Sequence, residues 1–328
     1  MRLPRPVSRC ARGLAIVFLA AAFPAAGQQL SALRIFPNLA GNIDRPLRYR
    51  PDGADFVIEN GGEFFNRSLY GGNTAFRVDG GDRPEFVLYL PGRGGNLRLA
   101  VRSPAGARWL HQAAHIVTRY RPGELLYEVR DPVLGSRGVL RVEALAYDQT
   151  EGLIVRATAE AIGPGFELVW AYGGVNGQRG QRDGDIGTER VPISQYFQLQ
   201  PEFCRENAFE VGNGRFTLRA RAATIAGLAP AGARLSLADA RQWNNLPSLL
   251  ADGAPQSPEL PVVVGRAPLT AGQPLFFSLQ RLAVDTAVAA DLNTYQEVSS
   301  ERQGAARKPA TLTLAPEYSA ADLPRHFA

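Results

Sequence analysis

The stretch from Asp55 to Val101 reads DFVIENGGEFFNRSLYGGNTAFRVDGGDRPEFVLYLPGRGGNLRLAV and predicts at least four short strands separated by glycine turns. Asn60-Gly61-Gly62, between FVIE and EFFN, indicates a hairpin, because Asn and Gly tolerate the positive φ of tight primed turns. Further turns are expected at residues 80–82 and 92–95, on either side of EFVLYL. Between the first two hairpins, Arg67 to Thr74 is predicted to be a polar loop with little to bury, close to whatever the protein binds.

The same strand-and-turn pattern continues on the C-terminal side of this stretch. Turns recur about every ten residues, and 139–146 alternates as half-buried antiparallel strands do. Roughly fifteen strands are expected, more than the seven to nine of an immunoglobulin-sized sandwich. No Pro/Ser-rich linker divides them, which favours one large antiparallel β-supersandwich over two sandwiches in tandem. The fold is therefore predicted to be all-β with one short C-terminal helix, at Asp291 to Arg302.

The ends of the chain are predicted to lie outside the sandwich. Residues 1–27 combine an arginine-rich start, a short apolar run and small residues at a cleavage site, which indicates a secretory signal peptide. A retained anchor is the alternative. An irregular lead-in is expected at 28–54, the supersandwich at 55–315 and a tail at 316–328. Export to the periplasm or the extracellular space follows from this interpretation.

Removal of the signal peptide changes the charge balance of the chain. Four of the 36 basic residues and none of the 31 acidic residues lie within it, so the mature chain carries a net charge of +1. A nucleic-acid partner therefore loses its main compositional support. Only Cys204 remains after cleavage, which excludes an internal disulfide. No later stretch approaches 18 consecutive apolar residues, so no membrane contact is expected after cleavage.

Two groups of residues have metal-ligand chemistry. His111 and His115 are four residues apart and would share a face of a helix or of a strand, but no third ligand is identifiable. Asp183, Asp185 and Glu189 supply oxygen ligands of the kind calcium prefers, although their spacing is not that of an EF-hand. A solvated loop or a sugar-contacting loop explains these carboxylates equally well. No cofactor is expected, and calcium is the alternative.

The sequence offers many carboxylates but no catalytic motif. Two of them could serve glycoside hydrolysis, yet their separation cannot be read from the sequence; the candidates are Asp55, Glu59, Glu63, Asp82, Glu85, Asp183, Asp185 and Glu189. Nucleophile-elbow, P-loop and dinucleotide-binding signatures are absent. Cys204 has no histidine near it in sequence and is interpreted as a small packing residue.

Aromatic residues beside Gly-rich loops give a better functional indication. A sugar stacks its apolar face on such rings while Arg, Asn and Asp bind its hydroxyl groups. The aromatic candidates are Tyr70, Tyr89, Trp109, Trp170, Tyr172, Tyr196, Phe197 and Trp243. Any single one of them is equally well explained as an ordinary core or rim residue.

Two sequence blocks resemble a known family. FVIENGGEFFNRSLYGGNTAFRVDGGDRPEFVLYLPGRGGNLRL and WAYGGVNGQRGQRDGDIGTE, followed by YFQLQPEFC, are similar to the N-terminal β-supersandwich of bacterial six-hairpin-glycosidase-like proteins, an uncharacterised secreted family. The resemblance covers most of Asp55 to about Arg307 and implies a galactose-mutarotase-like supersandwich. In that family a catalytic (α/α)6 helical toroid follows the sandwich, whereas this sequence stops at Ala328. True mutarotases use two well-separated histidines and a glutamate, which His111 and His115 match poorly.

The resemblance and the loop chemistry together predict a secreted, non-catalytic carbohydrate-active protein. It would contact glycan, or pack on a helical catalytic domain, through Arg67–Thr74 and Gly173–Glu189. An active glycoside hydrolase or sugar epimerase that uses loop carboxylates is the first alternative, and a structural module without a ligand is the second. The predicted ligand-binding residues are Arg67, Tyr70, Asn73, Trp170, Asn176, Arg182, Asp183, Asp185 and Glu189.

Overall fold

The structure is a computed structural model. Its chain divides into two units, residues 1–47 and residues 48–328. Nothing of the first unit lies among the described residues. The described part of the second unit comprises residues 48–70, 76–90, 92–147, 151–179, 193–251, 257–284 and 327.

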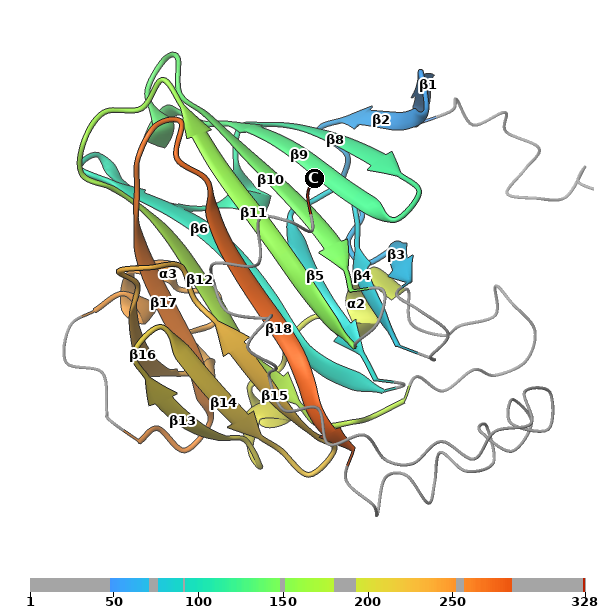
Figure 1. Ribbon diagram of the computed structural model, residues 1–328, viewed down its shortest axis with the longest axis vertical. Helices are drawn as coiled ribbons and strands as arrows, with labels where there is room; N and C mark the ends of the chain where they lie inside the picture. Colours follow the sequence, from blue (N-terminus) through green and yellow to red (C-terminus); the bar gives the residue numbers. More distant parts are fainter. Residues whose placement is uncertain are drawn as a thin grey trace, which may run out of the picture. The chain divides into compact units, whose positions relative to one another are not determined.

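The described strands form two antiparallel sheets (Figure 1). Sheet A has ten strands, in the order β1 (Arg50–Asp52), β2 (Asp55–Glu59), β8 (His115–Arg121), β9 (Glu124–Arg130), β10 (Val139–Ala146), β11 (Gly152–Glu160), β18 (Leu275–Val284), β15 (Ala223–Leu228), β14 (Arg215–Arg219) and β13 (Ala208–Gly212). Sheet B has the order β16 (Arg234–Asp239), β17 (Pro261–Leu269), β12 (Phe166–Val175), β6 (Arg93–Ser103), β5 (Glu85–Tyr89), β4 (Arg77–Gly80) and β3 (Arg67–Tyr70), with β7 (Gly106–Trp109) paired to β6.

The main hydrophobic core lies between the two sheets. Period-2 alternation points one face of every strand inward, and Leu97 and Leu99 of β6 occupy such inward positions. The rings of Trp170 from β12 and Phe277 from β18 meet across the core, with centroids 5.3 Å apart. The predicted all-β antiparallel sandwich is confirmed, and the described strands form a single pair of sheets.

Sheet B is buried on its outer face as well. Ala100, Val169 and Val264 point away from sheet A and pack in a second apolar cluster. Residues of η4 (Pro201–Cys204), η5 (Ala240–Gln242) and α3 (Leu246–Leu249) cover them, and Tyr196 of α2 (Ile193–Tyr196) packs on a third cluster that contains Val87. His111 of η2 (Leu110–Gln112) stacks on Trp109 of the second cluster. We call residues 110–112, 193–204 and 240–250 the covering layer. Its presence means that polar residues on the outer face of sheet B must find partners away from water.

Three polar residues of β6 bind main-chain carbonyl groups of the covering layer. Arg93 Nη2 donates to Tyr196 O at 2.6 Å, and Asn96 Nδ2 donates to Phe197 O at 2.7 Å. Arg98 Nη1 donates to Trp243 O at 3.2 Å. These bonds hold the layer on the sheet by satisfying donors and acceptors that burial would otherwise leave without partners.

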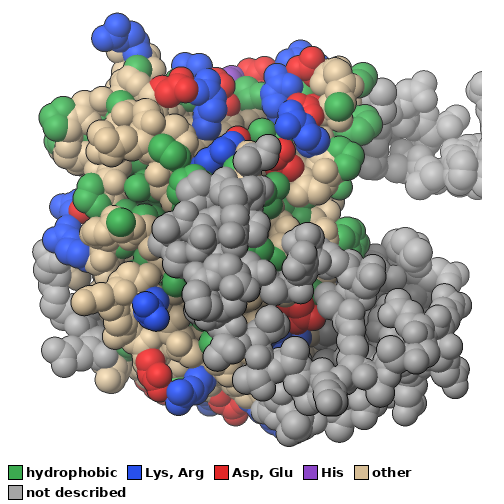
Figure 2. All heavy atoms as spheres, in the orientation of Figure 1, with side chains coloured by type: hydrophobic (Ala, Val, Ile, Leu, Met, Phe, Trp, Pro, Cys, Tyr) green, Lys and Arg blue, Asp and Glu red, His purple; other side chains and the backbone are tan. Residues whose placement is uncertain are grey.

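The outer face of sheet A carries cross-strand ion pairs beside one small apolar cluster, which consists of Leu145, Tyr147, Ile154, Phe276 and Phe327. Glu143 and Arg156 are direct partners on β10 and β11, and Arg156 Nη2 lies 2.6 Å from Glu143 Oε1. Arg121 Nε donates to Asp55 at 2.7 Å between β8 and β2. Figure 2 shows basic and acidic side chains interspersed over the upper part of this view. Alternation of this kind is what a solvated sheet face requires.

The expected hairpin between FVIE and EFFN is wrong. Asn60 does adopt a positive φ of 49°, but β2 pairs with β1 and β8 and not with residues 63–66. Asn60 Oδ1 accepts from Ile116 N at 2.9 Å, which ties the turn to β8. The chain then crosses to sheet B, where the buried Phe65 ring packs against Phe197 of the covering layer. Because Phe65 is buried there, residues 63–66 do not return along β2, and the turn at Asn60 does not close a hairpin.

Three further segments differ from the secondary structure that the sequence predicts. Arg67–Tyr70, predicted as a polar loop, is the edge strand β3, because Leu69 is buried and pairs opposite Val78. Gly173–Val175, predicted as part of a polar loop, is the buried end of β12. Arg50–Asp52, in the predicted irregular lead-in, forms β1. The predicted helix at Asp291–Arg302 lies outside the described residues, and no helix within the described part is long and apolar enough to cross a membrane.

Close packing at Gly265 gives a test of the core. A Cβ added at Gly265 would lie 2.1 Å from the Trp170 ring, so Gly265→Ala should lower the free energy of unfolding by about 1–3 kcal/mol. Gly163→Ala is the matched control, because its added Cβ meets nothing within 4 Å, and it should change the value by less than about 0.5 kcal/mol. Urea denaturation measures both variants. Equal effects would contradict the packing assigned to Trp170.

Candidate functional site

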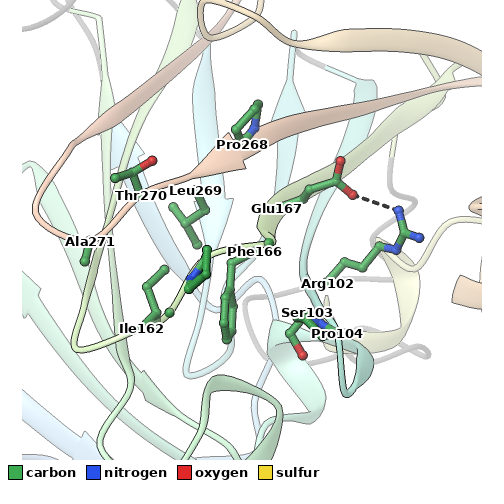
Figure 3. Close-up of a pocket in the computed structure, with 13 residues that line it drawn as sticks. Arg102, Ser103, Pro104, Ile162, Phe166, Glu167, Pro268, Leu269, Thr270 and Ala271 are labelled. Atoms are coloured by element: carbon green, nitrogen blue, oxygen red, sulfur yellow. Dashed lines mark hydrogen bonds and ion pairs between the residues drawn. The ribbon is translucent and has the colours of Figure 1, made fainter.

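A pocket in the described part of the chain is mainly apolar and has a volume of about 720 Å³. It lies where the β6–β7, β11–β12 and β17–β18 turns meet, and Ile162, Phe166 and Leu269 line it (Figure 3). Its charged groups are already paired, since Glu167 accepts from Arg102 and from Arg234, each at 2.9 Å. This pocket therefore offers no set of convergent polar groups with which to orient a ligand.

The second pocket has a volume of about 290 Å³ and is lined mainly by polar side chains. It opens between β7 with η2 on one side and the η5–α3 connection on the other. Its lining residues are Ala107, Arg108, Trp109, Gln112, Asn244, Asn245, Leu246 and Pro247. We call it the Trp109 pocket. An aromatic ring, three amides and a guanidinium converge there, and this makes it the candidate functional site.

A buried ion pair supports the pocket. Glu85 on β5 and Arg98 on β6 are direct cross-strand partners, and both are almost fully buried. Arg98 Nε donates to Glu85 Oε2 at 2.9 Å and Arg98 Nη2 to Oε1 at 3.1 Å, the two-point geometry that guanidinium and carboxylate favour. Burial raises the pKa of Glu85, and the charge of Arg98 opposes that shift.

Arg98 connects this ion pair to one wall of the pocket. Its guanidinium lies 5.4 Å from the ring centre of Trp109 and 4.9 Å from that of Trp243. Its Nη1 atom also donates to Asn244 Oδ1 at 2.9 Å. The backbone and the side chain at 243–244 are therefore held by one arginine from the sheet below, which orients the amide of Asn244 in the pocket wall.

His111 lies on the other side of Glu85. Its Nδ1 is 3.7 Å from Glu85 Oε2, and its ring stacks on Trp109 with centroids 6.2 Å apart. Burial, with the nearby charges of Arg98 and Arg83, lowers the pKa of His111 to about 3. His111 is therefore neutral at ordinary pH and contributes packing against Trp109, since it does not line the pocket.

The local sequence explains why these residues meet. In β6, Leu97 and Leu99 face the core, so Arg98 faces the covering layer, beside Glu85 of the adjacent strand. The β6–β7 turn then returns the chain, and Trp109 pairs opposite Ala100 at the end of β7. The arrangement can bind a polar ligand. Among the described lining residues there is no carboxylate, imidazole or thiol for acid–base or nucleophilic chemistry.

Four of the predicted ligand-binding residues, Arg67, Tyr70, Trp170 and Asn176, are described by the structure, and these four do not form one site. Arg67 lies on β3 with its guanidinium 4.4 Å from the Tyr49 ring, and Tyr70, at the end of the same strand, is 70% exposed. Trp170 is fully buried in the core, and a ligand cannot reach it there. Asn176 folds its own turn, with Oδ1 accepting from Gln178 N at 3.0 Å. Asn73, Arg182, Asp183, Asp185 and Glu189 lie outside the described residues.

The histidine pair does not form one site either. His115 lies on β8 with Nε2 2.7 Å from Glu59, whereas His111 is buried beside Glu85. Within the described part, no group of three His, Cys, Asp or Glu side chains could hold a metal ion. Cys204 is buried in the second apolar cluster, and burial raises the pKa of its thiol to about 12, so it has the packing role expected from the sequence.

Sequence reasoning named some of the pocket residues without joining them. Trp109 and Trp243 were among the candidate aromatics and Glu85 among the candidate carboxylates, 24 residues or more apart in the chain. Arg98, Asn244 and Asn245 were missed. The one available signal was Arg98 itself, a charge inside the long apolar strand NLRLAV, which indicates a polar partner when both faces of a strand are covered.

Loss of the Glu85 charge should destabilise the fold. Glu85→Gln leaves Arg98 buried without a counter-charge, so the free energy of unfolding should fall by about 3–5 kcal/mol in urea denaturation. The control is Glu210→Gln, which removes one partner of an exposed pair with Arg219 and should change stability little. A small effect of Glu85→Gln would contradict the assigned role.

The low pKa of His111 predicts a pH dependence of stability. Between pH 6.5 and about pH 3 the unfolded chain binds a proton at His111 that the folded chain does not, so stability falls as the pH is lowered. The slope contributed by this residue is at most about 1.4 kcal/mol per pH unit. Denaturation of the parent and of His111→Gln at pH 7, 6 and 5 measures it. The variant should show a shallower loss on acidification, and identical slopes would contradict the assignment.

Comparisons with known proteins give a family and one structural similarity. A comparison with curated proteins finds no match. The chain is similar in structure to a bacterial glucoamylase complexed with acarbose, at 12% sequence identity and a TM-score of 0.47. The match covers 74% of this chain and 37% of that one, so the chain spans little more than a third of the glucoamylase's length. Residues 90–303, which contain β6, β7, β12, β16 and β17 of sheet B and the covering layer around the Trp109 pocket, match a family model, and the chain belongs to the family described as Domain of unknown function (DUF4450).

Proposed function

We propose that the protein is a non-catalytic carbohydrate-binding protein and that the Trp109 pocket contacts the glycan. The observation that carries the proposal is the convergence of the side chains of Arg108, Gln112, Asn244 and Asn245 in a single concavity above the buried Trp109. Sugars present a ring of hydroxyl groups, and amides and a guanidinium are groups that bind hydroxyl groups.

The size of the pocket sets the scale of the ligand. Its volume of about 290 Å³ is at the lower end of ligand pockets, which begin at roughly 300 Å³. It therefore accommodates one sugar residue, and the rest of a glycan would extend over the surface. The lining residues around the pocket rim, Gln112, Asn244 and Asn245, are exposed and suit such an approach.

The wider context of the protein forms part of the same proposal. The sandwich is proposed to be of the galactose-mutarotase-like supersandwich type, exported by cleavage of residues 1–27 to the periplasm or the extracellular space. A helical (α/α)6 catalytic domain is proposed as a partner on which the sandwich packs. The large size of the two antiparallel sheets supports the supersandwich type, and the resemblance of the sequence blocks supports the proposed export and partner domain.

Glycan binding by the chain without residues 1–27 tests the proposal. The parent should bind at least one polysaccharide on a glycan array and by calorimetry. Gln112→Ala removes an exposed amide from the pocket rim and should weaken that binding about three- to tenfold, the value of one hydrogen bond. Gln273→Ala, an exposed glutamine in the β17–β18 turn, is the matched control and should bind as the parent does. A blank array, or equal weakening by both variants, would overturn the proposal.

A further inference from the structure

The two asparagines of the Trp109 pocket have NH2 groups that are available as hydrogen-bond donors. Asn244 Oδ1 accepts from Arg98 Nη1 at 2.9 Å, and Asn245 Oδ1 accepts from Ser248 N at 3.2 Å as the N-cap of α3. Guanidinium and backbone N–H groups donate and cannot accept, so the orientation of both amides is determined by chemistry. Each oxygen already accepts one hydrogen bond from the protein, and the NH2 groups remain for a ligand.

Arg108 adds a cation whose terminal nitrogens have no partner among the described residues. Its side chain is 49% exposed, and the nearest carboxylate, Asp131 Oδ2, is 3.8 Å from Nε. Asp131 is itself engaged, because its two oxygens accept from Val133 N at 2.9 Å and from Ala114 N at 3.0 Å. The guanidinium of Arg108 is therefore available to a ligand, with only a long-range contact to its neighbouring carboxylate.

Acceptors are scarce by comparison. None of the described lining residues is a carboxylate, and Gln112 has the only lining side-chain oxygen that no described donor occupies. The Glu85 charge below the pocket is matched by Arg98. The low pKa of His111, which arises mainly from burial, also reflects the positive charges of Arg98 and Arg83. The lining side chains thus present several unpaired donors, no negative charge and one available positive charge.

We propose that the Trp109 pocket recognises an acidic sugar, a hexuronic acid residue of a glycan, through its carboxylate. The carboxylate would accept from the Arg108 guanidinium in the two-point geometry these groups favour, and the asparagine NH2 groups would donate to it or to adjacent hydroxyl oxygens. The inference rests on the proposed carbohydrate function and specifies its ligand class. Neutral sugars match the pocket less well, because their hydroxyl groups both donate and accept while the pocket mostly donates.

The test compares ligands that differ only in charge. The chain without residues 1–27 is titrated with oligogalacturonate, oligoguluronate and hyaluronan fragments, with methyl-esterified oligogalacturonate and dextran as neutral ligands and dextran sulfate as a sulfated one. The parent should bind at least one uronate glycan at least about tenfold more tightly than any neutral ligand. Dextran sulfate should bind more weakly than that uronate.

Single substitutions test whether uronate binding takes place in the Trp109 pocket. Arg108→Gln should weaken uronate binding about 10- to 100-fold, the range expected when a charge-assisted hydrogen bond is lost. Asn245→Asp keeps the acceptor for Ser248 N while it replaces the donor with a negative charge, so it should weaken uronate binding as well. Arg215→Gln makes the same charge change on β14 of sheet A and should bind as the parent does. Thermal unfolding of each variant verifies that it folds.

The outcomes separate this inference from the proposed function. Binding of neutral glycans that Arg108→Gln leaves unchanged would overturn the preference for acidic sugars and keep the carbohydrate function. Equal weakening by Arg108→Gln and Arg215→Gln would mean that uronate binding depends only on the net charge of the protein. Tighter binding of dextran sulfate than of any uronate would mean the same, and either result would overturn the preference for acidic sugars. Failure of the parent to bind any glycan would overturn both.

Discussion

The burial of sheet B on both faces is the constraint on which the rest of the structure depends. A strand alternates its side chains between two faces, and from Arg93 to Val101 of β6 neither face meets water, so Asn96 and Arg98 lie in the interior beside Leu97 and Leu99. Buried polar groups are costly unless they are hydrogen-bonded. β6 meets this demand by donating from Arg93, Asn96 and Arg98 to main-chain carbonyl groups of the covering layer. The layer is therefore attached by polar contacts as much as by its apolar cluster.

The Trp109 pocket is a consequence of that attachment. Arg98 has more donors than Glu85 can accept from, and the remaining donor binds the backbone of Trp243 and the amide oxygen of Asn244. An amide whose oxygen is held inside the protein necessarily presents its NH2 group outward. The donor-rich character of the pocket thus arises from the structural ion pair beneath it. The orientation of Asn244 in the pocket wall and the pairing of Glu85 therefore depend on the same arginine.

The sequence predicted the fold well wherever local patterns and burial agreed. Strand alternation and glycine turns identified the sandwich, the β4–β5–β6 hairpins and its unusual size. The errors occurred where a long-range contact prevailed. Asn60 makes its turn but bonds to Ile116 of β8, and Phe65 packs beyond the sheet on Phe197. Turn residues determine the backbone conformation of a few residues. The strand that pairs with β2 is β8, which lies more than 50 residues further along the chain, and no turn residue indicates it.

The sequence by itself determined the all-β class and the positions of most strands, because period-2 alternation and glycine turns are local properties of the chain. It also indicated Trp109, Trp243 and Glu85 as candidate functional residues. Only the tertiary structure decided that Glu85 and Arg98 pair beneath Trp109, that Trp170 belongs to the core and that Asn244 turns its donor outward. Those facts depend on which face of each strand is covered and by which distant segment, and no local pattern carries that information.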